Sequence, residues 1–250
     1  MEIFKKMKQG VVIYENEHIV SIVTGFRKPS TNIKTGPMLQ QWILVKAFHP
    51  TEATHNYTDE LICGDCKRRH GTPEERKDTP DEEHSCYVVT GLGPAQVWNA
   101  WREGKYDVVE NVPIYLEYVA DLYSPCSKVR FGSYGDPSMV PDEVLHPWRE
   151  AARGYTAYTH QWHKRPDLVG KMMASVDSLE ERELAKQYGW RTFRVESDHN
   201  ARPMKDETVC LNARHATITC EACCLCNGKD RDIFIHDHGA YVPVRKRRAA

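Results

Sequence analysis

Hydrophobic and polar residues occur along this chain in short blocks whose character changes between its two halves. In the first third, runs of β-branched and aromatic residues cover 11–14, 19–23 and 41–48, and turn-forming residues separate these runs. In the second half, short apolar runs alternate with segments of helical periodicity. The pattern predicts a β-rich beginning followed by an α/β region.

The α/β region contains enough alternating elements to predict a parallel sheet. Helices are expected at 94–106, 113–123, 141–152 and 179–188. Strands are expected at 129–136, 155–160, 172–177, 191–195 and 232–236. Strands that alternate with helices favour βαβ units, because a parallel strand needs a crossover connection. We therefore expect an α/β fold, a partial parallel β/α barrel with cysteine-rich metal-binding ends. Its expected parts are an N-terminal β-rich segment (1–60), a barrel-like domain (61–243) and a basic tail (244–250).

Polar residues stand where the expected strands end. Ligand chemistry in parallel sheets and β/α barrels gathers at the carboxyl ends of the strands. The five strand ends carry, in order, Asp136, His160, Asp177, Glu196 or Asp198, and the run His236-Asp237-His238. Each residue alone is explained as a helix cap or a packed ring. Their recurrence predicts a polar pocket, with Asp136, His160 and Asp177 as candidate catalytic residues.

Composition and charge restrict the class of protein. The chain is 40% hydrophobic and 28% charged, with a formal net charge of −1, which argues against disorder and against binding DNA through bulk charge. The basic run 244–248 is interpreted as a solvated tail, with phosphate contact as the alternative. The polar segment 25–37 is interpreted as a long hairpin connection, with anion or ligand binding as the alternative.

No targeting or membrane signal is recognisable in the sequence. No apolar run approaches the roughly 20 residues that span a bilayer, and the N-terminus lacks the pattern of a secretory signal. A cytoplasmic location without membrane partners is therefore expected. Thiols stay reduced there, so the nine cysteines are expected to be metal ligands and not disulfide partners.

The C-terminal cysteines form the most specific pattern in the chain. With Cys224 set aside, they follow a C-x₉-C-x₂-C-x₂-C spacing, formed by Cys210, Cys220, Cys223 and Cys226. Three cysteines in a row at this spacing, with a fourth upstream, are similar to the ligands of a 4Fe-4S cluster. Zinc sites more often use two separated C-x₂-C hairpins. An iron–sulfur cluster is favoured, and zinc is the alternative.

The N-terminal group contains three cysteines: Cys63, Cys66 and Cys86. A histidine, with His70 and His84 close in sequence, would complete a four-ligand zinc site. Without one, the group would bind a cluster with an open iron, which reductive S-adenosylmethionine chemistry requires. The C-x₃-C-x₂-C spacing usual for that chemistry is absent. The remaining Cys126 is interpreted as a buried or incidental thiol.

Several of these motifs together resemble a family of bacteriophage and mobile-element proteins. The motifs are Cys86-Tyr87, the segments 129–136 (VRFGSYGD), 155–162 (YTAYTHQW) and 174–177 (ASVD), and the terminal cysteine cluster. The chain is similar over about residues 60–240 to the phage family of gene-product-88 type. That resemblance implies a radical-SAM-like layout, the seven grouped cysteines as cluster ligands, and Asp136, His160 and Asp177 in the pocket.

Three functions are compatible with these features. The first is an iron–sulfur enzyme, acting in the host cytoplasm if the chain is phage-encoded, on a nucleotide, nucleic acid or small metabolite. The second is a zinc-stapled protein that binds nucleic acid through the segment 25–37 and the basic tail. The third is a zinc-dependent hydrolase built from the polar strand ends: His160, His236, His238, Asp136 and Asp177.

Overall fold

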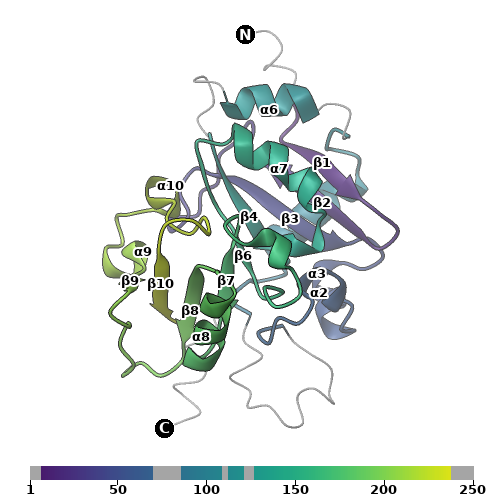
Figure 1. Cartoon of the computed structure of the whole chain (residues 1–250). Coiled ribbons are helices and arrows are strands. Elements are labelled where there is room, and N and C mark those ends of the chain that lie inside the picture. Colours follow the sequence, from purple (N-terminus) through teal and green to yellow (C-terminus); the bar gives the residue numbers. More distant parts are fainter. Residues whose placement is uncertain (1–6, 70–85, 109–111, 121–126, 238–250) are drawn as a thin grey trace.

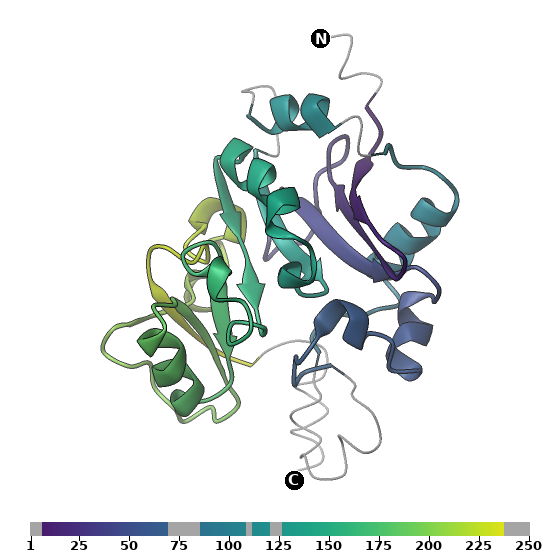
Figure 2. The same cartoon turned by 45° about the vertical axis from the view of Figure 1, so that its right-hand side comes forward.

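The computed structural model describes residues 7–69, 86–108, 112–120 and 127–237. Within these ranges the chain forms two five-stranded sheets with helices packed around them (Figure 1). Figure 2 shows the first sheet on the right and the second sheet on the left. The structure is therefore mixed α/β, as the sequence predicts.

The first sheet combines antiparallel and parallel strands. Its order is β1 (Gly10–Glu15), β2 (Ile19–Thr24), β3 (Leu39–Val45), β4 (Lys128–Tyr134) and β5 (Gly154–Thr156). The pairs β1–β2 and β2–β3 are antiparallel, whereas β3–β4 and β4–β5 are parallel. The N-terminal strands thus share one sheet with strands from the α/β region.

The second sheet is parallel throughout. Its order is β6 (Tyr158–Thr159), β7 (Met173–Val176), β8 (Thr192–Glu196), β10 (Asp232–His236) and β9 (Glu207–Val209). All four residues of β7 are buried, as expected of a parallel strand covered on both faces. The short strand β9 carries no clear alternation and was not predicted from the sequence.

The helices lie near the expected positions, with several additional short ones. The structure has α2 (Pro50–His55), α3 (Glu60–Cys63), α5 (Gly93–Arg102), α6 (Val112–Ala120), α7 (Asp142–Ala151), α8 (Leu179–Gln187), α9 (Leu211–Arg214) and α10 (Cys220–Cys223). Two 3₁₀ turns cover Pro137–Met139 and Pro166–Leu168. Helix α8 begins where expected because the Ser178 side chain accepts a hydrogen bond from the Glu181 amide, which caps the helix.

Helices α6 and α7 pack beside the first sheet through aromatic contacts (Figure 1). Phe26, which follows β2, lies 4.4 Å from Tyr115 of α6 and 6.1 Å from Trp148 of α7, measured between ring centroids. The Tyr118 hydroxyl donates to the Phe26 carbonyl at 2.9 Å. These buried aromatic side chains fix the helices against the sheet.

A single extended segment joins the two sheets. The sequence predicts one strand over 155–160, but the structure divides it at Ala157 into β5 and β6. The Ala157 amide donates to the carbonyl of Cys226 at 2.9 Å instead of pairing with a neighbouring strand. Strand β5 bonds to β4 of the first sheet, and strand β6 bonds to β7 of the second sheet. The chain therefore passes directly from the parallel edge of the first sheet to the edge of the second at Ala157.

The expected partial barrel is not confirmed. The first sheet has β1 and β5 as its edge strands, the second has β6 and β9, and none of these edge strands pairs with another. A closed barrel needs every strand to bond on both sides. Among the described residues, no helix is long and apolar enough to cross a membrane.

A buried ion network stabilises the second sheet. The Glu207 carboxylate, whose side chain is 0% exposed, pairs with the Arg182 and Arg194 guanidinium groups at 2.7–3.0 Å. Both arginine side chains are also buried. Burial raises the pKa of Glu207, but the hydrogen bonds from Arg194 and the Met204 amide and the charges of the two arginines together hold this pKa below its usual value. This network joins β8, β9 and α8.

Candidate functional site

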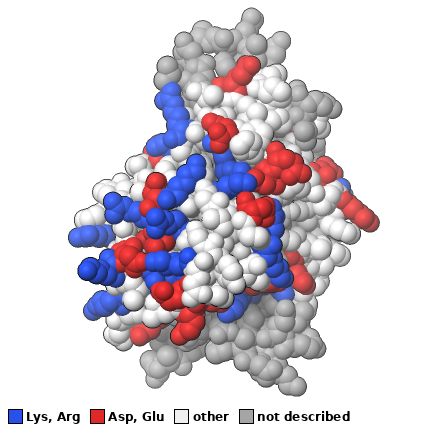
Figure 3. Space-filling view, viewed as in Figure 1, with Lys and Arg blue, Asp and Glu red and all other residues white. Residues whose placement is uncertain are grey.

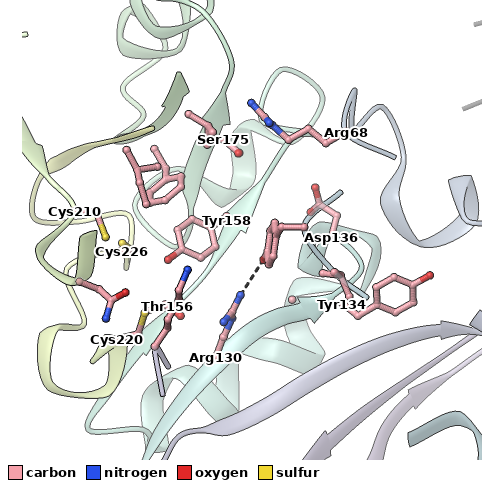
Figure 4. Close-up of a pocket in the computed structure, with 18 of the residues that line it drawn as sticks. Arg68, Arg130, Tyr134, Asp136, Thr156, Tyr158, Ser175, Cys210, Cys220 and Cys226 are labelled. Atoms are coloured by element: carbon pink, nitrogen blue, oxygen red, sulfur yellow. Dashed lines mark hydrogen bonds between the residues drawn. The ribbon is translucent and has the colours of Figure 1, made fainter. Parts of the chain in front are cut away.

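A pocket of about 400 Å³ lies where the two sheets meet. Alternate residues of consecutive strands line it: Arg130, Gly132 and Tyr134 of β4, Thr156, Tyr158 and His160 around β5 and β6, Ser175 of β7, Phe193 and Val195 of β8, and Ile235 and Asp237 around β10. Alternate residues of a strand point to the same face. The pocket therefore lies on one face of the joined sheets (Figure 4).

All eight cysteines that the structure describes line this pocket, and all are free thiols. Figure 4 shows Cys210, Cys220 and Cys226 on one side, with Tyr134 and Asp136 on the opposite side. The N-terminal and C-terminal cysteine groups, distant in sequence, therefore face one shared cavity. The ninth, Cys126, lies outside the described residues.

The N-terminal thiols influence one another and lie on the Asp136 side. Burial raises the pKa of Cys63 well above its usual value, and the sulfurs of Cys66 and Cys86 and the Asp136 carboxylate raise it further. The pKa of Cys86 is raised to about 12, mainly by burial, with a further contribution from Cys66. These influences identify Cys63, Cys66 and Cys86 as one group.

The C-terminal thiols form a second group beside Tyr158. Burial raises the pKa of Cys226, against a hydrogen bond from Tyr158, and Cys210, Cys220 and Cys223 raise it further. The pKa of Cys220 is also raised, first by burial and then by Cys210 and Cys223. Raised values mean that the thiols stay protonated at neutral pH unless a bound cation stabilises the thiolates.

The turn that carries the N-terminal cysteines is held against the end of β6. Helix α3 ends at Gly64, whose φ of 53° and ψ of −132° suit glycine. The Gln161 side chain donates to the Cys63 carbonyl at 3.2 Å. Asp65 pairs with His163 at 3.1 Å and with Lys164 at 2.5 Å. These contacts fix the positions of Cys63 and Cys66.

The C-terminal cysteine loop is held by the segment between β2 and β3. The Cys220 and Glu221 amides donate to the carbonyls of Lys34 and Thr35, both at 2.9 Å. Lys128 of β4 bonds to the Glu221 carbonyl at 2.6 Å and pairs with its carboxylate at 3.1 Å. The segment 25–37 is thus the expected connection between strands, and it also docks the cysteine loop. Sequence reasoning missed this second role.

Cys224, set aside in the sequence, differs in its contacts from the other C-terminal cysteines. It ends helix α10 in the left-handed conformation, with a φ of 49°. Its thiol donates to the Glu221 carbonyl at 3.5 Å and lies against Gly154 of β5. A backbone contact already occupies this thiol, which makes Cys224 a suitable control for its neighbours.

The structure does not show a formed metal site. Among the residues it describes, no three cysteine, histidine or carboxylate side chains are placed to hold one metal ion. The donor chemistry nevertheless fits, because buried thiols grouped in threes and fours are the ligands that zinc and iron–sulfur clusters use. Binding metal would require rotation of cysteine side chains within each group.

Asp136 has a structural set of contacts. Its carboxylate accepts hydrogen bonds from the Ser138 amide at 3.0 Å, the Ser138 hydroxyl at 2.7 Å and the His160 amide at 2.7 Å. It therefore caps the 3₁₀ turn at Pro137–Met139 and ties this turn to the end of β6. The carboxylate is buried and fully engaged.

His160 and Asp177 lie together beside the N-terminal cysteines. The His160 Nε2 atom lies 3.9 Å from the Cys66 sulfur and 3.8 Å from the Asp177 carboxylate. Burial lowers the pKa of His160, but the Cys66 sulfur, Asp177 and Asp136 outweigh it and raise this pKa to about 9. Asp177 is also paired with Arg68 at 2.7 Å. Of the three candidate catalytic residues, Asp136 and His160 line the pocket, whereas Asp177 contacts His160 but is not part of the pocket lining.

The later strand ends do not join this group. His236 stacks on His199 with centroids 5.1 Å apart and does not line the pocket, whereas Asp237 does. Asp237 is paired with His199 at 3.0 Å, and Glu196 with Arg194 at 2.9 Å. Asp198 is exposed, and His238, His70 and His84 lie outside the described residues.

Sequence reasoning also missed Arg130, Tyr158 and Phe193, which line the pocket. A signal for Arg130 exists in the sequence. Counting back from Asp136 in steps of two along the strand places Tyr134, Gly132 and Arg130 on the same face. Without the order of the strands, that face could not be identified as the wall of a pocket.

No family model, curated protein or solved structure matches this chain. The resemblance to phage proteins of gene-product-88 type therefore stays a prediction.

Proposed function

We propose that this protein is a metal-binding enzyme with two thiolate-ligated centres in one pocket. Iron–sulfur clusters are the preferred form, and zinc is the alternative. Cys63, Cys66 and Cys86 would hold the first centre. The second would use the C-terminal ligands: Cys210, Cys220, Cys223 and Cys226. A small molecule would react in the space between them, in keeping with the radical-SAM-like layout predicted from the sequence.

One observation carries this proposal: two cysteine groups distant in sequence line the same pocket. Buried free thiols without a shared role need no common location, and structural zinc sites usually lie apart from substrate pockets. Two grouped sets of soft ligands facing one cavity favour metal chemistry directed at a bound molecule. The parallel strands of the two sheets, which carry the pocket residues between the two cysteine groups, form a rigid support for the site.

His160 distinguishes a closed N-terminal centre from an open one. Bond lengths of about 2.3 Å to sulfur and 2.0 Å to nitrogen place two ligands of one tetrahedral zinc about 3.5 Å apart. The separation of 3.9 Å between His160 Nε2 and the Cys66 sulfur is close to this value. As a fourth ligand, His160 closes the site. As a hydrogen-bond partner only, it leaves one iron of a cluster open, as S-adenosylmethionine chemistry requires.

The charged surface gives less support to nucleic-acid binding. Over α8 and the neighbouring strands, Lys and Arg side chains are interleaved with Asp and Glu on the face seen in Figure 3. Nucleic-acid interfaces instead gather positive charge on one surface. We therefore keep the enzyme as the proposed function.

The proposal is tested by metal and sulfide analysis of protein purified without oxygen. We expect bound iron and sulfide with absorbance near about 400 nm, as thiolate–iron charge transfer gives. Cys66→Ser and Cys226→Ser should each remove the metal of one group and leave the other. Cys224→Ser is the matched control within the same loop and should retain all metal.

Two further results decide between the forms of the proposal. Colourless protein that contains zinc in both groups would replace iron–sulfur by zinc. His160→Gln should leave the iron content unchanged if the first centre is open, and should reduce its metal if His160 is a ligand. Protein that binds neither iron nor zinc, with cysteine variants indistinguishable from the parent chain, would refute the proposed function.

A further inference from the structure

Arg130 extends from β4 into the pocket between the two cysteine groups (Figure 4). One terminal nitrogen donates to the Thr35 hydroxyl at 2.9 Å, and the other donates to the Tyr87 hydroxyl at 2.9 Å. Both acceptors are neutral. The third nitrogen, Nε, is buried and has no hydrogen-bond partner among the described residues.

The charge of Arg130 is not balanced by a carboxylate. Within the described part of the chain, Arg130 forms no ion pair with a carboxylate, and its guanidinium group bonds to the Thr35 and Tyr87 hydroxyls. The two carboxylates that line the pocket are used elsewhere, because Asp136 caps a turn and Asp237 pairs with His199. A desolvated cation without a counter-charge is costly, so buried arginines are normally paired.

The other walls of the pocket suit a planar, partly apolar molecule. Tyr158 and Phe193 pack edge to face with centroids 4.7 Å apart, and Val195 and Ile235 lie beyond them. A volume of about 400 Å³ is within the usual range for small-ligand sites. Lys34 adds a second cation at the edge of the pocket. A third cation of the lining, Arg68, is already paired with Asp177.

We infer that Arg130 binds the carboxylate or phosphate group of a small planar anion held between the two cysteine groups. The planar guanidinium group forms paired hydrogen bonds with either kind of anion. The inference names the substrate class of the proposed enzyme, and it rests on the proposed function only for the claim that the bound anion is a substrate.

The inference has one competing explanation within the same pocket. Cys220 lies close enough to Arg130 to raise the pKa of the arginine together with Tyr87 and Tyr158, although burial opposes the shift. Arg130 would then serve only to balance the charge of the C-terminal thiolates. In that case Arg130 stabilises bound metal but has no effect on a soluble anion.

The experiment measures binding of four probes to the full chain by calorimetry: benzoate, inorganic phosphate, adenosine 5′-monophosphate and adenosine. We expect benzoate or adenosine 5′-monophosphate to bind at least about tenfold more tightly than adenosine, since a charge-assisted hydrogen bond contributes about 1.5–3 kcal/mol. The carboxylate and phosphate probes identify which anion the pocket prefers.

Arg130→Gln should weaken binding of the preferred anion at least about tenfold, and Arg130→Lys should have an intermediate effect. Arg191→Gln is the control, because Arg191 is half-exposed on the second sheet, outside the pocket lining. The comparison of adenosine 5′-monophosphate with adenosine on the parent chain needs no variant, so it tests the inference even if Arg130→Gln does not fold.

Equal affinity of the parent chain for anionic and neutral probes would overturn the inference, as would unchanged anion binding in folded Arg130→Gln. Metal content is measured on the same samples. Absence of anion binding combined with metal loss in Arg130→Gln would overturn the inference and leave the proposed function standing. Anion binding by a chain that holds no metal would support the inference and refute the proposed function.

Discussion

Replacing Gly64 by alanine should loosen the turn that presents Cys63 and Cys66. A Cβ atom at this position would lie 2.6 Å from both Cδ and Nε2 of Gln161, a distance that real Cβ atoms essentially never show. Gln161 is buried and is itself bonded to the Cys63 carbonyl, so it has little freedom to move away. The backbone at φ 53° and ψ −132° is also unfavourable for any residue with a side chain.

The expected cost is the sum of these two effects. A residue held in a sparsely populated backbone region costs about 1–3 kcal/mol, and the overlap in a packed site adds about 1–3 kcal/mol. A central value of about 4 kcal/mol corresponds to a fall in Tm of about 8–16 °C for a chain of this size. The matched control is Gly104→Ala, because Gly104 also has a positive φ, of 67°, but a Cβ atom there meets nothing within 4 Å. We expect about 1–2 kcal/mol for this control.

The measurement is urea denaturation of both variants, combined with metal analysis. Gly64→Ala should lose more stability than Gly104→Ala and should lose the metal bound by the N-terminal group, while the C-terminal group keeps its metal. Equal loss of stability in the two variants would show that contact with Gln161 does not fix the cysteine turn. Full metal retention in folded Gly64→Ala would refute its role in presenting Cys63 and Cys66.

Two further changes test other parts of the structure. Glu207→Gln should lower the free energy of unfolding by about 3–5 kcal/mol, because it removes the fully buried carboxylate that Arg182 and Arg194 share and leaves Arg194 paired only with the partly exposed Glu196. Exposed Glu183→Gln should cost less than about 1 kcal/mol. The lowered pKa of Glu207 means that its contribution is complete above the ordinary glutamate pKa and is lost as pH falls through the folded value. At pH values below about 5, the free energy of unfolding measured by urea denaturation should therefore decrease more steeply with falling pH for the parent chain than for Glu207→Gln. The same pH dependence in both proteins would contradict this role of Glu207. Gly228→Ala should displace the C-terminal cysteine loop, because a Cβ atom would lie 2.3 Å from the Met172 carbonyl oxygen, and metal analysis should show loss from that group alone. An unchanged metal content in this variant would show that the loop tolerates the displacement.

The sequence alone determined the local elements of this protein and the grouping of its cysteines. Periodicity acts over a few residues, so the strand at 232–236 and the helix from Leu179 were predicted to within one residue. The spacing of the C-terminal cysteines identified Cys224 as the exception, and its contact with the Glu221 carbonyl is in keeping with that interpretation.

Only the tertiary structure decided which of these local features meet. The order of the strands places His160 beside Cys66, and it arranges the strands in two sheets that do not confirm the expected partial barrel. It also leaves Arg130 in the shared pocket with neutral hydrogen-bond partners, although the sequence around Arg130 predicts only a strand. The physical reason is that side-chain periodicity is a property of neighbouring residues, whereas the pocket depends on sheet order and on backbone bonds such as that from Ala157 to Cys226.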